Sequence, residues 1–153
     1  MWFLGVFLIG FVAGLRALLA PTAASWAART GILAVAGTPF AFMGFRYTPL
    51  IFTILAIAEI INDKLPSAGS RKAPPAFVTR IMTGALAGAT VAAAGHGLVL
   101  GILVGAIGAA SGTLGGAAGR AKLAAIFGRD LPAALLEDVA GIAIAAFSVL
   151  WLG

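Results

Sequence analysis

Long apolar segments, separated by short polar stretches, fill most of this chain. A helix needs about 20 residues to cross roughly 30 Å of hydrocarbon. Five segments approach that length, at about residues 2–20, 48–64, 80–94, 97–114 and 132–152. The pattern predicts an all-α integral membrane protein in which residues 1–153 form a single domain, a compact bundle of four or five transmembrane helices. The first segment lacks a basic N-terminal region, so we expect it to remain as an uncleaved span.

Residues 21–47 fit neither a straight helix nor a solvated loop. They are too apolar for a loop, and the residues that interrupt them are Pro21, Gly31, Gly37, Pro39 and Gly44. Non-helical backbone is tolerated at membrane depth only where protein or a water-filled cavity satisfies its polar groups. We therefore expect a re-entrant or broken-helix element over 21–47. The alternative is an amphipathic surface helix near residues 22–29, followed by a poorly formed extra span.

The distribution of basic residues predicts an orientation. Residues 66–79 are polar, basic and rich in proline, as expected of an exposed loop. The loops after the second and fourth spans carry Lys64, Arg71, Lys72, Arg80, Arg120, Lys122 and Arg129, and the opposite side carries Arg29 and Arg46. An excess of Lys and Arg marks cytoplasmic loops, so 66–79 is predicted to be cytoplasmic. With five spans the N-terminus is then cytoplasmic and the C-terminus external, in what we expect to be a bacterial inner membrane.

The composition agrees with lipid as the solvent. Hydrophobic residues make up 61% of the 153 positions and charged residues 10%, with a mean hydropathy of +1.10, whereas soluble domains carry about a quarter charged residues. The absence of cysteine excludes disulfides, thiolate nucleophiles and cysteine-ligated metal sites. The net charge of +5 arises in short loops between apolar spans. It therefore indicates membrane orientation, with lipids as partners, and not nucleic-acid binding.

Glycine recurs at every fourth position in three runs. These runs are Gly84 and Gly88; Gly97, Gly101 and Gly105; and Gly108, Gly112 and Gly116. This spacing lets helix backbones approach closely in lipid. It predicts tight glycine-rich helix packing, either within the chain or in a homodimer. Residues 8–19 also weakly match 103–114, which would form an inverted repeat of the kind found in many transporters.

The few acidic residues indicate a candidate site. Glu59 and Asp63 stand four residues apart on one helix face, and Glu137 and Asp138 fall in the first turns of the last span, whereas Asp130 is predicted in a loop. A charged side chain in hydrocarbon is costly unless it is paired or hydrated, so such residues usually face the bundle interior. The predicted substrate- or ion-binding residues are Arg16, Glu59, Asp63, Arg71, Glu137 and Asp138, with Asn62, Lys64, Arg80 and Arg120 as secondary candidates. The alternative is a set of interfacial salt bridges and a favourable helix dipole.

Arg16 is the isolated cation of the first span. It either reaches the membrane surface along its own side chain or faces the interior, paired with an acid or an anionic solute. His96 is expected to be a plain turn residue between two glycines. No cofactor is predicted except a divalent cation: Glu59 and Asp63, with the Asn62 amide, would suit Mg²⁺ or another hard cation.

The stretch from Ala58 to Pro66, AEIINDKLP, followed by Ser70, Arg71 and Arg80, resembles the small bacterial membrane proteins of domain-of-unknown-function family 4126. The segments Gly14-Leu15-Arg16, Pro21 with Ala24-Ser25-Trp26, and Leu136-Glu137-Asp138 are similar too. The resemblance covers nearly the whole chain and implies a compact multi-span protein. It supplies no activity, so Glu59, Asp63, Lys64, Pro66 and Arg71 carry over only as motif positions.

Three functions remain open from the sequence. The first is a transporter or channel for an ion or small anionic solute, because buried opposite charges and interrupted helices are features that transporters need. The second is a membrane-embedded, metal-dependent enzyme acting on a phosphorylated lipid, although no catalytic motif is present and no catalytic residue is predicted. The third is a structural or assembly subunit of a membrane complex, held by its glycine faces.

Overall fold

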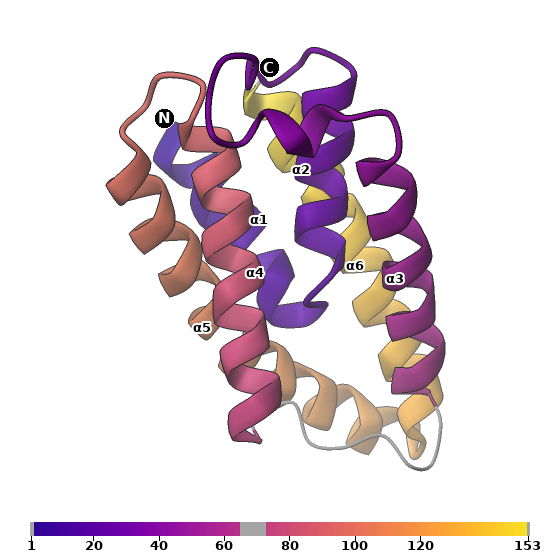
Figure 1. Ribbon diagram of the computed structural model, residues 1–153. Helices are drawn as coiled ribbons and strands as arrows, with labels where there is room; N and C mark the ends of the chain where they lie inside the picture. Colours follow the sequence, from indigo (N-terminus) through magenta and orange to yellow (C-terminus); the bar gives the residue numbers. More distant parts are fainter. Residues whose placement is uncertain (1, 65–72, 153) are drawn as a thin grey trace.

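The computed structural model describes residues 2–64 and 73–152, and this part of the chain is entirely helical, without strands. The helices are α1 (Trp2–Leu15), α2 (Leu19–Arg29), α3 (Thr48–Asp63), α4 (Pro74–Ala92), α5 (Leu98–Phe127) and α6 (Asp130–Leu152), with a short 3₁₀ helix η1 (Ala41–Gly44). They form one bundle (Figure 1). The predicted all-α class is therefore confirmed.

The first predicted span, 2–20, is wrong, because the chain reverses direction within it. Gly5 of α1 faces Leu152 at the end of α6, whereas Leu15 and Leu19 approach Gly141 in its middle. α2 then returns toward the end of the bundle at which α1 began (Figure 1). Residues 2–29 thus form a helical hairpin. Its tip, Arg16–Leu18, separates the two helices.

A proline explains where the hairpin breaks. Within a continuous helix Pro21 would have no N–H to donate to Ala17, and its ring would clash with that carbonyl. In the structure Pro21 instead lies in the first turn of α2, where a proline is tolerated. The re-entrant element predicted over 21–47 therefore lies earlier, and residues 31–47 form turns around η1. Part of this segment is buried: Ser25 Oγ donates a 2.6 Å hydrogen bond to the carbonyl of the buried Met43.

The hairpin tip lies at half the length of the bundle. Gly141, which packs beside Leu15 and Leu19, is 11 residues from each end of α6. At 1.5 Å per residue this is about 16 Å from either end. We call the end at which Trp2 and Leu152 lie the terminal end, and the end at which α3 finishes with Asp63 and α6 begins with Asp130 the charged end (Figure 1).

Helices α3, α4, α5 and α6 run between the two ends, and the second half of α5 lies across the charged end (Figure 1). The first and last described residues, Trp2 and Leu152, therefore lie at the same end of the bundle, so the predicted five-span chain with its ends on opposite sides is not supported. By length and composition, α5 and α6 are the two described helices able to cross a membrane, and α1 is a shorter apolar helix. The number of four or five spans is thus not confirmed.

The other predicted boundaries agree in part. α4 begins at Pro74 and Pro75, within the predicted loop 66–79, because prolines are favoured in a first helical turn. The predicted turn at Gly95-His96-Gly97 is confirmed, and Gly95 and Gly97 have φ values of +116° and +89° that favour glycine. The span predicted at 97–114 continues as α5 to Phe127. Because 8–19 is broken and 103–114 is continuous, the predicted repeat has no counterpart in the backbone.

The predicted tight packing of glycine-rich helices is confirmed within the chain. A Cβ atom added at Gly88 would lie 2.2 Å from the carbonyl oxygen of Gly101, and one added at Gly10 would lie 2.3 Å from that of Gly105. The backbones of α1, α4 and α5 therefore touch, as small residues permit in lipid. Most of these glycines pack inside the chain, and the predicted homodimer through them stays a prediction.

Candidate functional site

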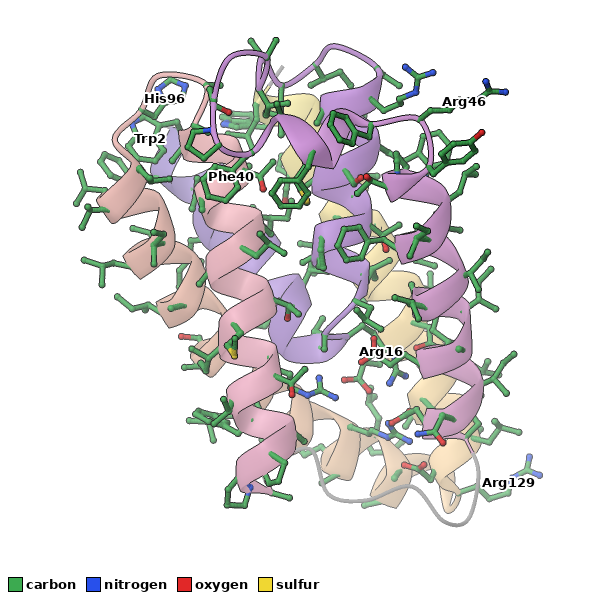
Figure 2. All side chains as sticks on the ribbon, in the orientation of Figure 1. Trp2, Arg16, Phe40, Arg46, His96 and Arg129 are labelled. Carbon is green, nitrogen blue, oxygen red and sulfur yellow. The ribbon has the colours of Figure 1, made fainter. Side chains whose placement is uncertain are left out.

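All five acidic residues of the chain gather toward the charged end, together with four cations. We call this group the charged cluster; it comprises Glu59, Asp63, Asp130, Glu137, Asp138, Arg16, Lys64, Arg80 and Arg120. Its members come from the hairpin tip and from α3, α4, α5 and α6. Figure 2 shows Arg16 directed toward this end from the middle of the bundle, and Arg129 directed away from the protein.

Arg16 is the most deeply buried member, with 0% of its surface exposed. Its Nε donates a 2.6 Å hydrogen bond to Asp138 Oδ1, its Nη2 lies 2.5 Å from the same oxygen, and its Nη1 lies 2.9 Å from Asp63 Oδ2. The two Nη contacts lack hydrogen-bond geometry, so charge attraction dominates them. The prediction that Arg16 faces the interior and pairs with an acid is confirmed, and the surface position is wrong.

Each carboxylate that holds Arg16 also has a second cation. Asp138 Oδ2 contacts the Lys64 ammonium, and Asp63 Oδ2 accepts a 2.7 Å hydrogen bond from Arg120 Nη1. A buried ion pair is costly to form because both charges lose water, and further hydrogen bonds offset that cost. Asp63 and Asp138 therefore each have a cationic partner other than Arg16.

Arg120 links the buried part of the cluster to the surface. Its Nε and Nη2 donate to the two oxygens of Asp130 at 2.9 and 2.5 Å, a bidentate arrangement, and its Nη1 lies 3.4 Å from Glu137 Oε2. The Asp130 side chain is 61% exposed. A continuous row of opposite charges therefore runs from Arg16, at half the length of the bundle, to the surface at the charged end.

Two other members of the cluster, Glu59 and Arg80, form hydrogen bonds with backbone groups at the hairpin tip. Helix ends leave N–H and C=O groups without partners. The Glu59 carboxylate accepts hydrogen bonds of 2.8 and 2.9 Å from the N–H groups of Ala17 and Leu18, where α2 begins. Arg80 Nη1 donates bonds of 2.6 and 2.8 Å to the carbonyls of Gly14 and Leu15, where α1 ends. Each charge also has the sign that its helix dipole favours.

Most of the predicted site residues come together. Arg16, Glu59, Asp63, Glu137 and Asp138 are all in the cluster, and so are the secondary candidates Lys64, Arg80 and Arg120. Asn62 is exposed on α3 and is not brought into it. Arg71 lies outside the described residues. His96 lies at the terminal end, where its ring stacks on Trp2 at 5.1 Å between centroids, as suits a turn residue.

Sequence reasoning missed Asp130, which was predicted in a loop. It is the first residue of α6, and its side chain pairs with Arg120. The signal was present: Asp130 follows Gly128, whose φ of +70° ends α5, and precedes Pro132. A C-terminal glycine followed by an acid and a proline is typical of one helix ending and another beginning.

The predicted metal ligands do not form a metal site. Glu59 accepts backbone N–H groups, whereas Asp63 contacts Arg16 and Arg120, so their carboxylates serve different partners. Across residues 2–64 and 73–152, no group of three or more His, Cys, Asp or Glu side chains is placed to hold a metal ion. The cluster is a network of paired cations and carboxylates.

Comparisons with protein-family models, with curated proteins and with solved structures find no match to this chain. The resemblance to domain-of-unknown-function family 4126 therefore stays a prediction, and any function must be argued from the geometry of the charged cluster.

Proposed function

We propose that this chain is a small polytopic membrane transporter for a small anionic solute, with Arg16 as the residue that binds the solute. The observation that carries the proposal is the position of Arg16: fully buried, at the tip of a re-entrant hairpin, and held by two carboxylates. Interrupted helices with charges near the midplane are the usual form of a transporter's binding site.

Exposed apolar side chains support a membrane location. Large hydrophobic residues that are more than half exposed cover α3, α5 and α6, including Ile54, Val99, Ile107, Val139 and Leu150. Contiguous apolar surface of this kind is rare on a soluble monomer. The lengths and apolar compositions of α5 and α6 agree with it.

The cations support an orientation different from the sequence prediction. Lys64, Arg120, Lys122 and Arg129 belong to the charged end, whereas Arg29 and Arg46 lie at the terminal end. The positive-inside rule then makes the charged end cytoplasmic, and both chain ends lie on the external side. The predicted cytoplasmic N-terminus required residues 2–20 to cross the bundle as one helix. In the bundle the chain reverses direction between α1 and α2. For a bacterial chain the membrane is the inner one.

The chemistry of Arg16 suits a carboxylate or phosphate solute. Guanidinium binds such groups through parallel hydrogen bonds, and Asp138 and Asp63 already provide carboxylate oxygens at this position. A solute anion can replace them without leaving either acid bare, because Asp138 keeps Lys64 and Asp63 keeps Arg120. The row of charges from Arg16 to Asp130 gives the solute paired positions toward the cytoplasmic side.

One observation favours a second function, that of a structural or assembly subunit. The cations and acids of the cluster pair with one another, and Glu59 and Arg80 serve the backbone of the hairpin. A cluster of this kind also holds a fold together without any solute. The two functions differ in whether an added anion changes the stability of the protein.

The test is anion-induced thermal stabilisation of the purified protein in detergent. Monocarboxylates, dicarboxylates, inorganic phosphate and glycerol phosphate are compared at constant ionic strength, in the wild type, in Arg16→Lys and in Arg129→Lys. A ligand that binds the folded state raises its stability. Arg16→Lys keeps the charge and loses the bidentate geometry, whereas Arg129 is an exposed control.

We expect one anion class to stabilise the wild type and Arg129→Lys and to have a much smaller effect on Arg16→Lys. The same anion should then enter liposomes that contain the wild type. Equal stabilisation of all three proteins, or none by any anion, would contradict transport through Arg16 and favour the structural subunit.

A further inference from the structure

A small apolar groove lies between α2 and α6, away from the charged cluster. Its volume is about 270 Å³, and it is open to the surface. Its lining residues are Ala23, Trp26, Ala27, Thr30, Ile32, Ala145, Ala146 and Val149. Small-molecule sites usually measure roughly 300–1,000 Å³ and combine mostly apolar walls with a small number of precisely placed polar groups. This groove is smaller and lined almost wholly by alkyl and ring carbon, so it suits a single hydrocarbon chain.

The groove reaches the part of the protein where a membrane's headgroup zone would lie. Trp26, which lines it, donates a 2.9 Å hydrogen bond from its indole Nε1 to Thr53 of α3. Tyr47, exposed at the start of α3, and Trp151, near the end of α6, lie toward the same end. Amphipathic rings gather at the boundary between hydrocarbon and water. A molecule in the groove therefore has its polar part at the terminal end.

The charge at this end is positive. Arg29, the last residue of α2, is exposed and directly precedes Thr30 of the groove wall in the sequence, and Arg46 is exposed just before α3. All five acids of the chain belong to the charged cluster, so no aspartate or glutamate is present at the terminal end to neutralise these cations. Arg46 already stacks on Tyr47, with 5.5 Å from its guanidinium carbon to the ring centroid. Arg29 is the cation nearest in sequence to the groove.

We propose that this groove binds one acyl chain of an anionic phospholipid, whose phosphate is held by Arg29. The inference rests on the membrane location proposed above and is independent of transport through Arg16. An apolar groove at an end of the protein that carries exposed cations and no acidic side chain complements a lipid that has one hydrocarbon chain to insert and one negative group to pair. The protein would bind such a lipid in preference to a zwitterionic lipid with the same chains.

The experiment compares phosphatidylglycerol with phosphatidylcholine of identical acyl chains, added to the full-length protein in detergent, with thermal stability as the readout. Ala146→Phe fills the groove from its exposed edge, and Ala143→Phe adds the same ring at an exposed position of α6 outside the lining. Arg29→Gln removes the proposed phosphate ligand, and Arg46→Gln removes a cation of the same end that is not a sequence neighbour of any lining residue.

We expect phosphatidylglycerol to stabilise the wild type, Ala143→Phe and Arg46→Gln alike, and phosphatidylcholine to stabilise them clearly less. The shift should fall by about half or more in Ala146→Phe and in Arg29→Gln. Equal shifts in the Arg29 and Arg46 variants would overturn the proposal by indicating general charge attraction. A dimer that Ala146→Phe disrupts, with no difference between the two lipids, would overturn it in favour of a second copy as the occupant.

Failure of this proposal is distinguishable from failure of transport. Ala146→Phe should retain the anion-induced stabilisation that depends on Arg16, because the groove and the charged cluster share no residue. Loss of the lipid effect alone contradicts the groove, and loss of the anion effect alone contradicts the transporter.

Discussion

Arg16 and Asp138 lie 122 positions apart in the chain, yet Arg16 Nε donates a 2.6 Å hydrogen bond to Asp138 Oδ1. The bond joins the first helical hairpin to the last helix. It is made inside the protein, because Arg16 is fully buried and the Asp138 side chain is nearly so. The contact therefore ties the tip of the hairpin to the middle of the sequence of interactions at the charged end.

Asp138→Asn should strongly destabilise the protein, because Arg16 and Lys64 would lose the anion that they share. Removing one partner of a buried ion pair costs about 3–5 kcal/mol. Asp130→Asn removes a largely exposed partner of Arg120 and should cost about 1 kcal/mol or less. Thermal unfolding in detergent measures both. Similar losses in the two variants would contradict the assignment of Asp138 as the buried anchor.

Glu59→Gln keeps the size of the side chain and should still loosen the hairpin tip. The carboxylate accepts N–H groups from both Ala17 and Leu18, whereas an amide has one oxygen acceptor and one NH₂ donor. A buried donor left without a partner costs about 1–3 kcal/mol. Hydrogen exchange at residues 16–20 should become faster in Glu59→Gln and stay unchanged in Asp130→Asn. Unchanged exchange in both would show that Glu59 does not hold the tip.

The re-entrant hairpin predicts that His96 and Arg46 face one side of the membrane and Arg129 the other. The chain has no cysteine, so single cysteines at these three exposed positions are specific reporters. A membrane-impermeant maleimide added to intact spheroplasts should label His96→Cys and Arg46→Cys and should label Arg129→Cys only after the membrane is opened. Tags at the two chain ends should report the same side. Tags on opposite sides would show that α1 crosses the membrane.

Gly10→Ala should separate α1 from α5. Its methyl group would lie 2.3 Å from the carbonyl oxygen of Gly105, which is backbone and cannot move aside as a flexible side chain can. Overpacking of this kind costs about 1–3 kcal/mol or more. Gly119→Ala is the matched control: nothing lies within 4 Å of its added methyl group, and the gain in helix propensity is up to about 1 kcal/mol. Gly10→Ala should therefore unfold at a lower temperature, and Gly119→Ala at an equal or higher one.

The charged cluster was predictable because charged residues are rare in this chain and each one constrains the fold. Burying Glu59, Asp63 or Asp138 without a partner is costly, which favoured a shared polar cluster, but the sequence left open whether Arg16 joined it or reached the membrane surface. The individual pairings did not follow. Whether Glu59 meets a guanidinium or two backbone N–H groups depends on where the hairpin turns, and no spacing rule gives that position.

The hairpin itself was missed because the hydropathy of a segment indicates that it is buried in an apolar environment but not which way the chain runs through the bundle. Residues 2–20 are apolar whether the chain crosses the bundle or turns back halfway, and Arg16 interrupts them only once. Pro21 was the available signal. Its effect falls at Ala17, four residues earlier, because a proline disrupts the hydrogen bond to the preceding turn. Glycine spacing has a related limit, because it indicates close contact without identifying the neighbour: Gly10, Gly88 and Gly105 pack inside the chain, and the homodimer stays a prediction.

The hairpin tip also imposes an order on synthesis and insertion. The chain is made from its N-terminus, so α1 and α2 are the first helices to leave the ribosome, but the groups that satisfy their tip belong to later segments. Glu59 comes from α3, Arg80 from α4 and Asp138 from α6. Exposed backbone at this depth is not tolerated in lipid without such partners. In the membrane location proposed above, the first two helices would therefore have to wait at the membrane surface, or with an insertion factor, until the rest of the bundle is made.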